Sequence, residues 1–127
     1  MWEHDKIIQQ LKQALGEKAK MRENIKHYKP DISYMLDGSR VVVEIETYAN
    51  PSKITQDIVF SHMIGANKLV LIFSNKHKGG AKRMESAYSI LHMLRRCFPE
   101  LCRLEVKAFW ADDFEDIAKL CLPFFVS

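Results

Sequence analysis

The chain has 127 residues, 47% hydrophobic and 28% charged, which suits one domain over residues 1–127 with a sizeable core. Its formal net charge of +3 permits a polyanionic partner without requiring one. It contains no apolar run of about 18 residues, no secretory signal and no CxxC spacing among its cysteines, so we expect no membrane span, disulfide framework or zinc site, and a cytoplasmic location.

The first part of the chain predicts a helix, a short strand and a β-hairpin. Apolar residues at helical spacing predict a helix from about residue 3 to 22, which Gly16 weakens or splits. Residues 24–29 are a candidate short strand. Two further strands, 31–36 and 39–47, flank Asp37-Gly38, a strong signal for a two-residue turn.

The second part of the chain alternates helices with strands. Asn50 and Pro51 predict an N-cap and a first-turn proline for a helix that runs to about residue 64, before Gly65. The elements expected after it are strands at 68–74 and 104–110 and helices at 80–97 and 112–120. The order predicts an α/β fold with a mixed sheet flanked by helices, in which the last two strands are parallel.

The predicted hairpin gathers negative charge on one face. Pairing across the turn places Asp31 directly opposite Glu44, with Glu46 on the same face. The opposite face is apolar and is expected to join the core; its residues are Ile32, Tyr34, Leu36, Val41, Val43 and Ile45. Opposed like charges destabilise a hairpin, and a divalent cation such as Mg²⁺ would remove that penalty. The alternative interpretation is a solvated strand face.

The spacing of these residues resembles a nuclease signature. Pro30-Asp31, twelve residues and then Glu44-Ile45-Glu46 are similar to the motif of the PD-(D/E)xK superfamily. The resemblance implies a restriction-endonuclease-like αβββαβ core over about residues 3–74, followed by a C-terminal αβα extension. It also implies that Mg²⁺ or Mn²⁺ is bound by Asp31, Glu44, the backbone carbonyl of Ile45 and, as a departure from the usual motif, Glu46. The superfamily normally has Lys at that last position, and Lys53 on the following helix is the candidate replacement.

The resemblance extends to neighbouring helices. The segment from Gln56 to Phe60 is similar to the Q-x-x-x-Y helix motif of the RecB-like branch, with Phe in place of Tyr. This similarity implies that Gln56 positions a phosphate or a metal-bound water. The first helix often supplies one more acidic residue in this superfamily, and Glu3 and Glu17 are the candidates here.

A basic segment and an apolar tail complete the candidate surfaces. Four residues around Gly79-Gly80 are expected to contact DNA phosphates, although a solvated basic loop is the alternative; they are Lys76, Lys78, Lys82 and Arg83. The apolar tail at 121–127 either covers the core or forms a homodimer contact.

Together these features predict a Mg²⁺-dependent endonuclease that hydrolyses DNA phosphodiester bonds, a function implied by the resemblance. The alternative is a module that retains the nuclease fold without catalysis and binds nucleic acid or a protein. Metal dependence separates the first hypothesis from the second.

Overall fold

The structure is a computed structural model that describes residues 3–46, 50–74 and 80–111. The predicted helix 112–120, the C-terminal tail, Lys76 and Lys78 lie outside these ranges. The helices are α1 (Glu3–Leu15), α2 (Pro51–Met63), α3 (Gly80–Cys97) and a 3-10 helix (Pro99–Arg103). The strands are β1 (Lys20–Met21), β2 (Ile32–Leu36), β3 (Ser39–Glu46), β4 (Lys68–Ser74) and β5 (Glu105–Ala111).

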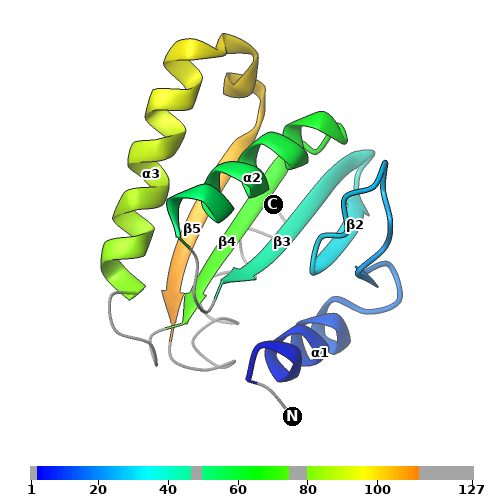
Figure 1. Ribbon diagram of the computed structural model, residues 1–127. Coiled ribbons are helices and arrows are strands. Elements are labelled where there is room, and N and C mark those ends of the chain that lie inside the picture. Colours follow the sequence, from blue (N-terminus) through cyan, green and yellow to red (C-terminus); the bar gives the residue numbers. More distant parts are fainter. Residues whose placement is uncertain (1–2, 47–49, 75–79, 112–127) are drawn as a thin grey trace.

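The strands form one five-stranded mixed sheet in the order β1-β2-β3-β4-β5 (Figure 1). Strands β1, β2 and β3 are antiparallel neighbours, whereas β4 pairs parallel with β3 and β5 pairs parallel with β4. The predicted α/β class and the predicted parallel pairing of the last two strands are therefore confirmed. Within the described ranges, no helix has both the length and the apolar character that a membrane span requires.

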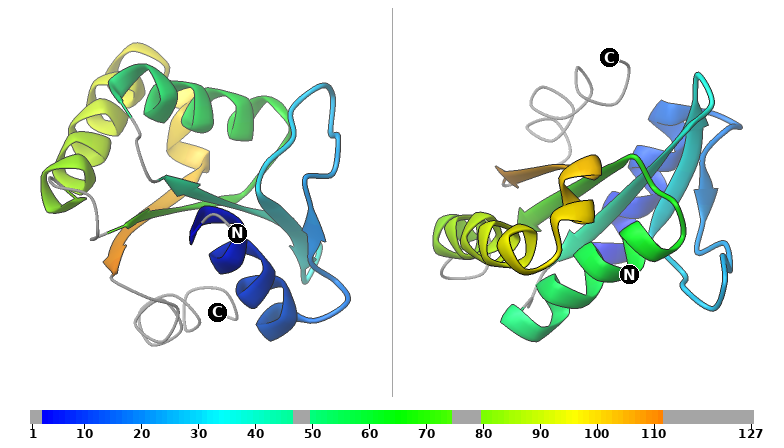
Figure 2. Two further views of the ribbon diagram at one scale, coloured as in Figure 1. Left: turned by 60° about the horizontal axis from the view of Figure 1, so that its bottom comes forward. Right: turned by 90° about the horizontal axis from the view of Figure 1, so that it is seen from above.

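Helices cover both faces of the sheet, with α1 on one side and α2 and α3 on the other (Figure 2). Strand β3 is central, and its side chains alternate between the two layers. Val41, Val43 and Ile45 pack in the core beneath α1. Val42 packs in the second core, beneath α2 and α3. Glu44 and Glu46 share the face of Val42, so the strand directs them into the layer between the sheet and α2.

The N-terminal region differs from the prediction in two places. Helix α1 ends at Leu15 instead of continuing to residue 22, because Gly16 adopts a φ of +86° and closes the helix. The predicted strand at 24–29 is wrong. Those residues form a turn in which Ile25 and Tyr28 make an isolated bridge, and the first strand is instead β1, whose two residues are both exposed.

The β2–β3 hairpin follows the predicted register. Leu36 pairs with Ser39 and Ser33 pairs with Val42. Asp37 and Gly38 have φ values of +50° and +81°, and positive φ at both turn residues is the requirement of a type I′ turn. The predicted apolar face lies in the core under α1, which confirms the alternation.

Helix α2 begins and ends as predicted. The Asn50 side chain accepts a 2.9 Å hydrogen bond from the backbone N–H of Lys53, and Pro51 occupies the first turn. Gly65 follows the helix with a φ of +81°. The buried residues of α2 are Ile54, Asp57, Ile58 and Ser61. One carboxylate and one hydroxyl therefore lie on the helix face that packs on the sheet.

Candidate metal centre

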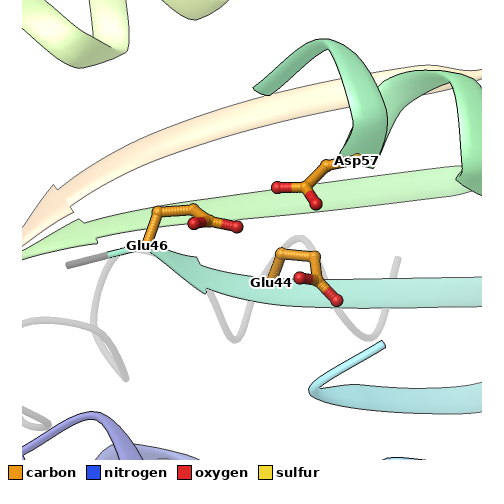
Figure 3. A group of neighbouring side chains, drawn as sticks. All are labelled: Glu44, Glu46 and Asp57. Atoms are coloured by element: carbon orange, nitrogen blue, oxygen red, sulfur yellow. The ribbon is translucent and has the colours of Figure 1, made fainter. Parts of the chain in front are cut away.

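Three carboxylates converge between β3 and α2. Glu44 and Glu46 project from β3, and Asp57 projects from α2 toward them (Figure 3). Each offers one oxygen, and the three oxygens lie within 4.8 Å of one another. All three residues are buried, with relative exposures of 4%, 5% and 0%. Oxygen atoms at such spacing are the ligand type that Mg²⁺ and Mn²⁺ prefer.

The convergence follows from the two side-chain periodicities. Residues two apart on a strand share one face, so Glu44 and Glu46 lie side by side under α2. Asp57 falls between Ile54 and Ile58 on the buried stripe of α2, and this stripe turns its carboxylate toward the sheet.

A lysine reaches the same cluster from the first turns of α2. The Nζ of Lys53 lies 2.6 Å from Asp57 Oδ1, 3.5 Å from Glu44 Oε2 and 3.6 Å from Glu46 Oε1. The Lys53 side chain is 45% exposed, so its ammonium group lies between the carboxylates and solvent. The structure thus brings together Glu44, Glu46 and Lys53, which the sequence analysis had singled out.

The cluster has acceptor capacity that the described residues do not use. Glu46 Oε1 and Asp57 Oδ2 are buried and make no hydrogen bond with the residues that the structure describes. Buried polar atoms in folded proteins nearly always have a partner, which is a protein group, a water or an ion. The Lys53 ammonium, 3.6 Å from Glu46 Oε1, partly serves that oxygen, and Asp57 Oδ2 favours a bound cation or ordered water at the centre.

Burial makes these carboxylates weak acids. Burial, followed by the charges of Asp31 and Asp57, raises the pKa of Glu44 to about 8. Burial and the neighbouring Glu46 raise the pKa of Asp57 to about 9, and burial also raises the pKa of Glu46. Without a metal the cluster therefore holds protons more tightly than exposed carboxylates do. A cation that binds there must displace them.

The pKa of Lys53 is raised, although burial alone would lower it. Burial lowers it, but the adjacent carboxylates, chiefly Asp57, outweigh burial and raise it above the ordinary value. The side chain consequently stays cationic at neutral pH. It can neutralise part of the carboxylate charge, or donate hydrogen bonds to another anion.

Asp31 lies beside the centre, with its side chain turned to the backbone. Its Oδ2 accepts a 2.8 Å hydrogen bond from the backbone N–H of Ile45, and its own N–H donates a 2.8 Å bond to Glu44 Oε1. The bond from Asp31 N–H holds Oε1 of Glu44, and the other oxygen, Oε2, faces Lys53. Asp31 is outside the group of three carboxylates, which contains Asp57 instead, and the role of Asp31 as a metal ligand stays a prediction.

None of the remaining predicted residues that the structure describes belongs to the group of three carboxylates. Gln56 is exposed, although it precedes Asp57. Glu17 is exposed in the turn after α1, and Glu3 begins α1. Lys82 and Arg83 are in the first turn of α3, which starts at the edge where the parallel strands end (Figure 1).

Asp57 is the functional candidate that sequence reasoning missed. A signal for it exists: Ile54, Asp57, Ile58 and Ser61 follow the i, i+3, i+4, i+7 spacing of a buried helix face. A carboxylate on such a stripe needs a partner, and Lys53 lies four residues before it. The Q-x-x-x-Y similarity directed attention to Gln56, one residue away and on the exposed face.

No protein-family model, curated protein or solved structure matches this chain. The resemblance to PD-(D/E)xK nucleases therefore stays a prediction. A function for this protein has to follow from the chemistry of its own side chains.

Proposed function

We propose that the protein is a Mg²⁺- or Mn²⁺-dependent endonuclease that hydrolyses DNA phosphodiester bonds. The observation that carries the proposal is the convergence of Glu44, Glu46 and Asp57 on one point, where two buried oxygens lack a hydrogen bond to the described residues. A lysine beside that point adds the second element that phosphodiester hydrolysis needs. The nuclease signature at Asp31, Glu44 and Glu46 supports the same reaction class.

The residues fit a hard divalent cation. Glu44, Glu46 and Asp57 would hold it through carboxylate oxygens, and a bound Mg²⁺ supplies a water of lowered pKa and charge neutralisation at a phosphate oxygen. Asp31 fixes Glu44 through its backbone N–H, which orients one carboxylate before any ligand arrives.

Lys53 would stabilise charge on the phosphate. Its side chain is half exposed and flexible, so its ammonium group can turn from Asp57 to a phosphate oxygen without unfolding α2. A cation positioned at developing negative charge is a large contributor to phosphoryl-transfer rates. Lys82 and Arg83 at the start of α3 would contact phosphates farther along the DNA, together with Lys76 and Lys78.

One observation favours a second candidate, a non-catalytic module that binds nucleic acid or protein. Lys53 already lies within 3.6 Å of all three carboxylates and partly neutralises them. Such an arrangement can serve as a buried ion-pair network that needs no metal.

Metal titration separates the two candidates. Calorimetry with Mn²⁺ and Mg²⁺ should show a saturable site in the wild-type protein that is lost in Glu44→Gln and kept in Glu100→Gln, which alters an exposed glutamate on the 3-10 helix. Cleavage of plasmid, single-stranded and branched DNA should require the metal and fail in the same variant. Absence of a saturable site would reject the endonuclease and leave the non-catalytic module.

A further inference from the structure

A small pocket lies between the turn at residues 26–28 and the C-terminal end of α2. Its volume is about 190 Å³. It is lined by Lys26, His27, Tyr28, Phe60, Met63 and Ile64. Phe60 follows Asp57 by three residues, which corresponds to about 4.5 Å along the helix axis. Asp57 itself does not line the pocket, so the link between the pocket and the carboxylate cluster runs through Tyr28.

Tyr28 joins the pocket to the cluster. Its ring contacts Phe60, with centroids 5.5 Å apart and planes inclined by 45°. Its hydroxyl is buried and makes no hydrogen bond of normal geometry with the described residues. Burial first, and then the charges of Glu44 and Asp57, raise the pKa of Tyr28, so the hydroxyl stays protonated and can donate. Tyr28 thus lines the pocket, and the charges of Glu44 and Asp57 act on its hydroxyl.

The turn that supplies Lys26 and His27 has an unusual backbone. Both residues have positive φ values, +50° and +73°, a conformation that residues other than glycine rarely adopt. The backbone N–H of His27 donates to Asn24 Oδ1 at 2.9 Å, and Ile25 and Tyr28 exchange two backbone hydrogen bonds. These bonds hold the turn in place. Strain of this kind concentrates at ligand sites.

We propose that this pocket receives one nucleobase of a nucleic-acid substrate, a proposal that rests on the proposed function. The exposed face of Phe60 offers a stacking surface for the base, Lys26 supplies positive charge at the rim for the flanking phosphate, and the His27 imidazole offers a ring N–H donor. The volume is below the roughly 300–1,000 Å³ of pockets for drug-sized ligands, so a single ring system fits and a whole nucleotide does not. An apolar side chain of a protein partner is the competing occupant.

The test uses a short fluorescein-labelled single-stranded DNA in EDTA, so that binding is measured without metal. Phe60→Ala should weaken binding by roughly 5- to 150-fold, because base–aromatic stacking is lost. The matched control is Met93→Ala, which removes a large exposed apolar side chain from α3 and should leave binding unchanged. The salt dependence of binding should be the same in all three proteins, because no phosphate contact is altered.

A second probe identifies the base itself. The same DNA with abasic sites throughout should bind the wild-type protein as weakly as normal DNA binds Phe60→Ala. Equal binding of normal and abasic DNA, equal loss in Phe60→Ala and Met93→Ala, or no DNA binding by the wild-type protein would each overturn the nucleobase proposal. Metal titration tests the proposed function separately. The wild-type protein can have a Mn²⁺ site that Glu44→Gln removes even if the pocket binds no base.

Discussion

At the scale of single residues, the decisive feature is one ammonium group among three carboxylates. Lys53 Nζ contacts Asp57 at 2.6 Å and is the group that would compete with a metal for the same oxygens. We predict that Lys53→Met lowers Mg²⁺-dependent cleavage by at least about 100-fold, because a cation at the transition state is lost. Mn²⁺ affinity in calorimetry should be kept or increased, because the competing charge is gone.

Lys107→Met, which removes an exposed lysine from β5, is the control for Lys53→Met and should leave both quantities unchanged. Loss of Mn²⁺ binding together with cleavage in Lys53→Met would contradict a role at the phosphate. It would show instead that the lysine maintains the carboxylate geometry.

The raised pKa values make a prediction about pH. The pKa of Glu44 is raised from 4.5 to about 8 and that of Asp57 from 3.8 to about 9, so the folded state binds more protons than the unfolded state between these limits. The free energy of unfolding of metal-free protein should therefore fall as pH rises from roughly 5 to 9. Urea denaturation in EDTA at a series of pH values measures this dependence. Glu44→Gln should reduce the slope of the free energy of unfolding against pH by an amount that corresponds to up to about one bound proton. An unchanged slope in that variant would refute the assignment.

At the scale of elements, side chains continue the β2–β3 hairpin beyond its last backbone pair. Asp31 Oδ2 accepts from Ile45 N, and Glu44 Oε1 accepts from Asp31 N. We predict that Asp31→Ala lowers the free energy of unfolding by about 1–3 kcal/mol, because the Ile45 N–H loses its acceptor. Asp31→Asn keeps an acceptor oxygen and should lose less than half of that amount in urea denaturation.

The Asp31→Asn variant also decides between two sets of metal ligands, one without Asp31 and one with it. If Glu44, Glu46 and Asp57 hold the metal, Asp31→Asn should weaken Mn²⁺ binding by at most about 100-fold, as expected for a residue behind the ligands. Complete loss of binding in Asp31→Asn would make Asp31 a ligand, as the resemblance implies.

At the scale of the whole molecule, metal binding should be visible as stability. The carboxylates come from a strand and a helix that are separate in the sequence, so a cation between them ties the sheet to α2. Mn²⁺ at about 100 times its Kd should add about 2.7 kcal/mol and raise Tm by about 10 °C. Thermal unfolding with and without EDTA measures the shift, which Glu44→Gln should abolish and Glu100→Gln should retain. An equal shift in both variants would place the metal elsewhere.

Local signals predicted several elements well. The hairpin register follows from Asp37-Gly38, and the start of α2 follows from Asn50-Pro51. Turn and cap geometry depend on a few adjacent residues, and side-chain alternation follows from the strand itself. The β1 strand could not be predicted in this way, because its two residues are both exposed and carry no alternating pattern.

The sequence by itself determined that Glu44 and Glu46 share one face of β3 and that Lys53 and Asp57 share one face of α2, because both periodicities are local. Only the tertiary structure decided that these two faces meet. The distance between a strand and a helix depends on the packing of Val42, Ile54 and the residues around them, which no spacing along the chain encodes. The same packing buries the three carboxylates, and burial raises their pKa values, so that protons, the Lys53 ammonium or a metal cation must balance their charge there.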